Sequence, residues 1–143
     1  FADYFSHWLS FDKAGAKLPK IFHVNWFRKG ADGKFLWPGY GENLRVLEWI
    51  IGRCDGSRSA VETPVGRVPA PSDINLEGLG LPRTAIDSLF EIDVEGWAKE
   101  MAATGEYLDS FGPRMPQALK DEQQRIAAAL SNATTSQAQT ASG

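Results

Sequence analysis

Apolar residues recur at helical spacing at the start of the chain. Phe1, Tyr4, Phe5, Trp8 and Leu9 follow the pattern i, i+3, i+4, i+7 and i+8, which predicts a helix over residues 1–9 with one aromatic face. A face this apolar is expected to be buried. Because nine residues do not fold alone, we expect its packing partner elsewhere in the protein.

The next pattern is typical of a β-hairpin. The stretch from Ile21 to Phe27 is rich in β-branched and aromatic residues and predicts a strand. Asp32-Gly33 is a strong turn signal, and the residues Phe35–Trp37 would return as the second arm. Pro38 lacks the amide proton that a continued ladder needs, so the pairing is expected to end there.

The rest of the chain predicts helices separated by one irregular region. Prolines and glycines make residues 55–81 irregular. Gly52 or Gly56 is expected to end the first of the later helices, Pro82 stands near the start of the next, and Asp93 is the expected N-cap of the third. Glu95 and Lys99 form an expected i,i+4 pair on that third helix. The predicted helices cover residues 43–54, 83–92, 93–111 and 116–130.

These elements predict an α+β fold, a hairpin plus several helices, that forms part of a larger domain. We expect residues 1–130 to belong to that domain. The remainder, residues 131–143, contains no large apolar side chain and is expected to form a disordered tail.

Composition narrows the classes of function. The chain has 143 residues, 43% hydrophobic and 23% charged, which is typical of a soluble globular protein. Its formal net charge of −3 provides no overall attraction for nucleic acid, and no apolar run approaches the ~20 residues of a membrane span. Cys54 is the only cysteine, which favours a reducing compartment such as the cytoplasm.

No complete catalytic constellation can be assembled from the sequence. His7 and His23 are the only histidines, and neither belongs to a recognisable metal or nucleophile motif. We expect both to be structural. The phosphate-binding pattern GxxxxGK[ST] does not occur, so no catalytic and no metal-ligating residue is predicted in this chain.

A dense group of aromatic residues on loops is the strongest functional signal. It lies beside Gly39 and Gly41, and its rings could fill a core, stack on a planar base or face a sugar. Asn43 adds a carboxamide that both donates and accepts hydrogen bonds, which suits the edge of a purine. The rings are those of Trp26, Phe27, Phe35, Trp37 and Tyr40.

The stretch PKIFHVNWFRKGADGKFLWPGYGENLRVLEW, residues 19–49, resembles the guanine-binding region of GTP-dependent phosphoenolpyruvate carboxykinases. The upstream YFSHWLSF is similar to a helix of that family, and TPVGRVP and INLEGLGL are similar to two of its later stretches. The likeness extends over about residues 1–112. Two departures stand out: Tyr40 occupies a position where the family usually has Phe, and Leu44 replaces a small polar residue.

The resemblance implies that the whole protein converts oxaloacetate and GTP to phosphoenolpyruvate, GDP and carbon dioxide in gluconeogenesis. It also implies manganese and magnesium, bound outside this chain, and a monomeric cytoplasmic protein whose partners are small molecules and neither nucleic acid nor membrane. The phosphate loop, metal ligands and oxaloacetate-binding arginines of the family precede this region. The chain therefore resembles the C-terminal quarter of the enzyme and is expected to be inactive alone.

The resemblance also assigns roles to the aromatic segment, residues 26–43. Phe27 and Tyr40 would sandwich the guanine of GTP or GDP, with Phe35 packed against its edge. The remaining positions complete the pocket: Trp26 supports the wall, Gly41 and Glu42 contribute backbone, and Asn43 reads the edge of the base.

Two alternatives stay open at this stage. The chain could be a stand-alone purine-nucleotide-binding module without catalysis, or an aromatic-rich structural domain. Replacing Phe27 or Tyr40 separates the structural reading from the other two, because only a stacking ring should affect nucleotide selectively.

Overall fold

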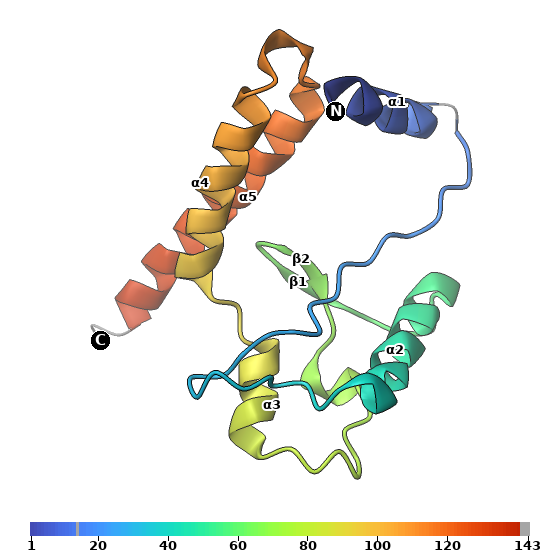
Figure 1. Cartoon of the computed structure of the whole chain (residues 1–143), viewed down its shortest axis with the longest axis vertical. Helices are drawn as coiled ribbons and strands as arrows, with labels where there is room; N and C mark the ends of the chain where they lie inside the picture. Colours follow the sequence, from blue (N-terminus) through green and yellow to red (C-terminus); the bar gives the residue numbers. More distant parts are fainter. Residues whose placement is uncertain (14, 141–143) are drawn as a thin grey trace. The chain divides into compact units, whose positions relative to one another are not determined.

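The computed structural model describes residues 1–13 and 15–140, which form helices and one small sheet (Figure 1). This confirms the predicted α+β class. The chain divides into two compact units, one made of residues 20–91 and the other of the segments that flank them. The elements in chain order are α1 (Ala2–Lys13), α2 (Asn43–Asp55), β1 (Val61–Thr63), β2 (Gly66–Val68), α3 (Arg83–Phe90), α4 (Val94–Asp109) and α5 (Gln117–Thr140), with single 3-10 turns at Tyr40–Glu42, Pro71–Asp73 and Gly112–Arg114.

In the unit formed by the flanking segments, α4 and α5 pack along each other (Figure 1). Asp93 caps α4, as predicted, since its Oδ1 accepts a hydrogen bond of 2.9 Å from the amide of Gly96. Leu130 of α5 is fully buried. A small apolar cluster of Ala2, Leu108 and Met115 holds α1 against this pair, with Phe5, Phe111 and Leu119 packed around it.

The last helix is longer than predicted. We expected the helix to end near Leu130 and a disordered tail to follow, but α5 continues to Thr140. The sequence contains neither proline nor glycine between Gln117 and Ser142, so nothing in it interrupts the helical hydrogen bonds. Residues 141–143 of the expected tail lie outside the described residues.

In the unit formed by residues 20–91, α2 contributes the buried residues Trp49 and Gly52. Trp49 is buried on this helix, and its indole Nε1 donates a 3.2 Å hydrogen bond to the carbonyl of Ser59. Gly56 follows the last residue of α2 with φ at 85°, a left-handed conformation that glycine adopts without strain. The predicted helix and one of its two predicted endpoints are therefore confirmed.

The predicted strand over Ile21–Phe27 is wrong, because residues 21–25 have no regular secondary structure and residues 26–27 form a turn. The predicted hairpin is reduced to its tip, where a single antiparallel bridge joins Lys29 to Phe35. A strand needs hydrogen-bonding partners from another segment, and local composition does not supply them.

The one sheet in the described residues lies in the region predicted to be irregular. Strands β1 and β2 are antiparallel, and Thr63 is paired with Gly66 across the turn at Pro64-Val65. Glu62 and Arg67 face each other across the ladder and form an ion pair of 2.6 Å. Proline is favoured at the first central position of such turns, so Pro64 is the local sequence signal for this hairpin.

The aromatic face of α1 is only partly covered. Ala2 is buried and Phe5 is half-buried, but Phe1, Tyr4 and Trp8 remain exposed among the described residues. The predicted helix is confirmed, but the described residues do not bury its aromatic face. No helix in the described ranges 1–13 and 15–140 combines the length and apolarity needed to cross a bilayer.

Candidate functional site

A tight turn brings two rings of the aromatic segment together, those of Phe27 and Phe35. The amide of Gly30 donates to the carbonyl of Lys34 at 2.9 Å, and the amide of Leu36 donates to the carbonyl of Arg28 at 2.9 Å. These bonds bring Phe27 and Phe35 together with ring centroids 5.7 Å apart and planes at 64°, an edge-to-face arrangement. The ammonium of Lys29 lies 5.6 Å from the centroid of the Phe35 ring.

These rings are not used as a core. Phe27 is 70% exposed, Phe35 is 56% exposed and Tyr40 is 92% exposed. An exposed aromatic side chain leaves its flat face available to a planar ligand. Within the described residues, these three rings therefore do not fill a core.

A second turn places Tyr40 beside the start of α2. Gly39 has φ at 127°, which is accessible to glycine and strained for other residues. The amide of Glu42 donates to the carbonyl of Gly39 at 3.1 Å, which closes the turn. An added side chain at Gly41 would meet nothing within 4 Å, so open space lies in front of this backbone.

Glu42 and Arg45 attach this turn to the rest of its unit. The carboxylate of Glu42 accepts a hydrogen bond of 2.6 Å from Arg45 Nε, and Arg45 Nη1 donates to the carbonyl of Asn75 at 2.7 Å. Both side chains of the ion pair are largely covered. The side chain of Glu42 thus helps to hold the loop through Arg45.

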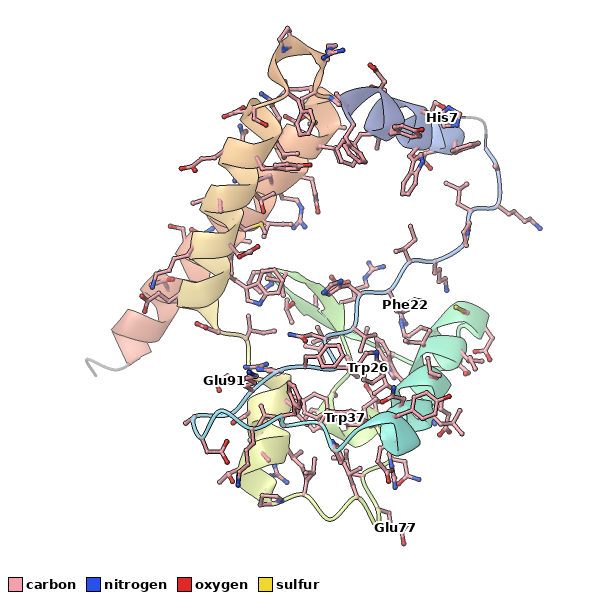
Figure 2. The ribbon with its side chains drawn as sticks, viewed as in Figure 1. His7, Phe22, Trp26, Trp37, Glu77 and Glu91 are labelled. Carbon is pink, nitrogen blue, oxygen red and sulfur yellow. The ribbon has the colours of Figure 1, made fainter. Side chains whose placement is uncertain are left out.

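Two tryptophans connect the turn of Phe27 to Asn43. Trp26 is half-buried, and its ring centroid lies 6.0 Å from that of the buried Trp37 (Figure 2). The indole Nε1 of Trp37 donates a hydrogen bond of 2.8 Å to Asn43 Oδ1. Asn43 is the first residue of α2, and its amide donates to the carbonyl of Tyr40.

Sequence reasoning did not identify the polar residues that support the rings. Arg28 Nη1 donates to the carbonyl of Glu91 at 2.9 Å and to that of Leu89 at 3.5 Å, and these carbonyls lie at the end of α3. Arg45 has the comparable role described above. The spacing of Glu42 and Arg45 was a usable signal for their pair, whereas nothing local indicates the partner of Arg28.

The structure therefore brings together some of the predicted residues and not others. Phe27 contacts Phe35, while Trp26 and Asn43 are joined through Trp37. Within the described residues no other ring is stacked on Tyr40. This arrangement offers flat apolar faces and one oriented carboxamide, which suits noncovalent recognition of a planar polar ring.

The histidines lie outside this arrangement. Both are exposed, and the ring of His7 packs edge-to-face on that of Phe11, with centroids 4.9 Å apart. A shallow, open hollow of about 190 Å³ on α1 is lined by Asp3, Tyr4 and His7. It contains none of the predicted site residues.

Comparison with known proteins gives a consistent picture. Residues 1–129 match the family model described as the phosphoenolpyruvate carboxykinase C-terminal P-loop domain. The chain is 54% identical over 125 residues to the "Phosphoenolpyruvate carboxykinase [GTP]" of Chlamydia felis, a match that covers 86% of this chain and 21% of that protein. It is 52% identical over 123 residues to the protein of the same name in Treponema pallidum, covering 84% of this chain and 20% of that protein. The chain thus spans about a fifth of the length of the relatives it matches.

Proposed function

The chain belongs to the family of the phosphoenolpyruvate carboxykinase C-terminal P-loop domain, and from this premise we propose that it supplies guanine recognition to a GTP-dependent phosphoenolpyruvate carboxykinase. The proposed reaction of the intact protein converts oxaloacetate and GTP to phosphoenolpyruvate, GDP and carbon dioxide. In this proposal the chain binds the base of the nucleotide, and the chemistry occurs on residues outside it.

The roles proposed for the aromatic segment follow its geometry. Phe27 and Tyr40 stack on the two faces of the base, with Phe35 at its edge. Trp26 forms the pocket wall, and the backbone of Gly41 and Glu42 lies at the rim. Asn43 contacts the polar edge of the base through its carboxamide.

The observation that carries this proposal is the exposure of three rings on turns that are held by internal hydrogen bonds. Phe27, Phe35 and Tyr40 are exposed, yet the bonds at Gly30, Leu36 and Glu42 fix the backbone that bears them. Because the backbone is already fixed, only side-chain freedom is lost when a ring stacks on a base, so more of the ~1–3 kcal/mol of stacking free energy per base appears as affinity.

The metal ions of the proposed reaction are not assigned to this chain. Within the described residues no group of three or more His, Cys, Asp and Glu side chains is arranged to hold a metal ion. By family resemblance, we propose that the intact protein is a cytoplasmic monomer that acts on small molecules.

Kinetics of the intact protein with Phe27→Ala and Tyr40→Ala test the proposal. Each substitution removes one stacking face, so the KM for GTP should rise about tenfold, while the KM for oxaloacetate should change less than about twofold. Gly41→Ala provides a third variant, because its added methyl group contacts no protein atom and should only crowd the bound base.

Tyr107→Ala is the matched control. Tyr107 is also exposed and also packs edge-to-face on a phenylalanine, Phe111, with ring centroids 5.1 Å apart. It lies on α4, outside the aromatic segment, so its removal should leave the KM for GTP unchanged. Equal changes in both KM values for Phe27→Ala and Tyr40→Ala, with loss of folded protein, would refute the stacking roles and favour a structural one.

A further inference from the structure

The hydrogen bond between Trp37 and Asn43 determines which way the carboxamide of Asn43 points. An indole N–H can only donate, so the atom of Asn43 that lies 2.8 Å from Trp37 Nε1 must be the carbonyl oxygen. The oxygen and the nitrogen of the carboxamide lie in one plane, on opposite sides of the Cβ–Cγ bond axis. Trp37 uses one lone pair of this oxygen, whereas both hydrogens of the NH2 group remain available to donate to another molecule.

Both ends of this hydrogen bond are fixed. The Trp37 side chain is only 8% exposed and packs on the ring of Trp26. Asn43 is held as the first residue of α2, and its own amide donates to the carbonyl of Tyr40. A half-turn of the carboxamide would place NH2 against the indole N–H, leaving two donors face to face. The observed orientation is therefore the only one that satisfies Trp37.

The two common purine bases differ at the atom that such an NH2 group would meet. Guanine and hypoxanthine carry an oxygen at position 6, which accepts hydrogen bonds. Adenine carries an amino group there, which donates. An NH2 group held in place donates a hydrogen bond to a 6-oxo base. With a 6-amino base it faces a second donor and forms no hydrogen bond, so the site can discriminate strongly between the two bases.

We propose that Trp37 is a specificity-determining positioning residue, whose indole N–H orients Asn43 so that its NH2 group donates to the 6-oxo group of a purine. The inference rests on the proposed function, because it requires a base between the aromatic rings. It adds that adenine nucleotides are disfavoured through Trp37, a residue that does not itself touch the base.

The first test measures the dissociation constants of GTP, ITP and ATP for the intact protein and for Trp37→Phe. Phenylalanine keeps a buried ring and removes the N–H, so the carboxamide becomes free to turn. The preference for GTP over ATP should fall about tenfold, and the preference for ITP over ATP should fall with it. An unchanged preference in a folded Trp37→Phe protein would overturn the proposal.

Trp49→Phe is the matched control. Trp49 is also buried, and its indole also donates one hydrogen bond, to the carbonyl of Ser59 at 3.2 Å, but it does not contact Asn43. Both variants lose one buried indole hydrogen bond and should lose comparable stability. Only Trp37→Phe should change the ratio of GTP to ATP affinity. A similar change in Trp49→Phe would mean that the ratio of GTP to ATP affinity falls whenever the protein is destabilised. That result would also overturn the proposal.

Asn43→Asp tests the orientation of the Asn43 carboxamide with Trp37 intact. It therefore tests the proposal even if Trp37→Phe fails to fold. The carboxylate still accepts the hydrogen bond from Trp37, but now presents an oxygen to the base. If the wild-type residue donates to the 6-oxo group, GTP and ITP affinity should fall at least tenfold. If the wild-type carboxamide instead accepts from the N–H groups of guanine, Asn43→Asp should keep or strengthen GTP binding, which would overturn the proposal.

Failure of the proposed function is distinguishable from failure of this inference. If the wild-type protein binds GTP and ATP equally, there is no base recognition to explain, and both fail. If the wild-type protein prefers GTP and Phe27→Ala weakens GTP binding, but Trp37→Phe leaves the preference unchanged, the base site stands and only the role of Trp37 is rejected.

Discussion

Gly52 lies in the middle of α2, where glycine is less favourable than alanine by about 1 kcal/mol. Its presence has a steric cause. A Cβ atom at this position would lie 2.3 Å from Cγ of Arg58 and 3.2 Å from its Cβ, so the loop after α2 packs directly on the glycine. The amide of Arg58 also donates to the carbonyl of Gly52 at 3.1 Å, which fixes the loop in that position.

Gly52→Ala should therefore destabilise the protein in spite of its better helix propensity. The expected loss is about 1–3 kcal/mol, because the stem of Arg58 cannot move away without its backbone. Urea unfolding followed by circular dichroism measures this loss as a lower midpoint.

Gly105→Ala is the control for the same substitution in another helix. There the added methyl group would meet only the amide end of Gln123, with Nε2 at 3.1 Å. A shift of a few tenths of an ångström relieves this contact and lets Gln123 keep its 2.8 Å hydrogen bond to the carbonyl of Met101. Its stability should stay within about 1 kcal/mol of wild type. A Gly52→Ala protein as stable as Gly105→Ala would show that the contact with Arg58 is not restrictive.

At the scale of elements, α4 shows how strongly a local signal can specify a helix. Asp93 caps its first turn, and Glu95 and Lys99 form an exposed ion pair of 2.7 Å one turn later. The hydrogen bond to Glu95 raises the pKa of Lys99 above its usual value. Because both side chains of this pair are in solvent, its contribution is small beside that of the cap.

Asp93→Ala should destabilise α4 by about 1 kcal/mol, since the amide of Gly96 loses its acceptor. Asp93→Asn keeps a side-chain oxygen in the same place and should retain most of the stability. Thermal unfolding of the two variants provides the comparison. If Asp93→Ala melts at the temperature of Asp93→Asn, the capping bond contributes little to the stability of this unit.

The same contrast between local and distant partners explains how much could be predicted from the sequence. The helices were predictable because their caps and periodic faces are read within a few residues, as at Asp93 and Gly56. The strand predicted over residues 21–27 was wrong because strand pairing depends on a distant segment. The hairpin that does form, around Pro64, was not predicted because its two strands are only three residues long. The aromatic residues of the site could be named, but their hydrogen-bonding partners could not, since Arg28 meets carbonyls more than sixty positions away.

At the scale of the whole molecule, the uncovered face of α1 dominates the behaviour expected of this chain in solution. The ring of Phe1, just before α1, and those of Tyr4, Trp8 and Phe11 on this helix are all exposed. Ala2 and Phe5 account for the packing of α1 in the apolar cluster. Contiguous apolar surface of this kind drives association in water, because each ring removed from solvent contributes favourable free energy.

The purified chain should therefore associate as its concentration rises, and substitution of two exposed rings by charged residues should prevent this. Tyr4→Glu and Trp8→Lys together keep the net charge unchanged and add opposite charges four positions apart, an arrangement that helices tolerate well. Sedimentation velocity from micromolar to hundred-micromolar protein should show growing species for the wild-type chain and a constant monomer for the double variant. Because neither residue belongs to the buried cluster of Ala2, Leu108 and Met115, the helical circular dichroism signal should be the same in both. A wild-type chain that sediments as a monomer over this range would show that the exposed face of α1 does not drive association.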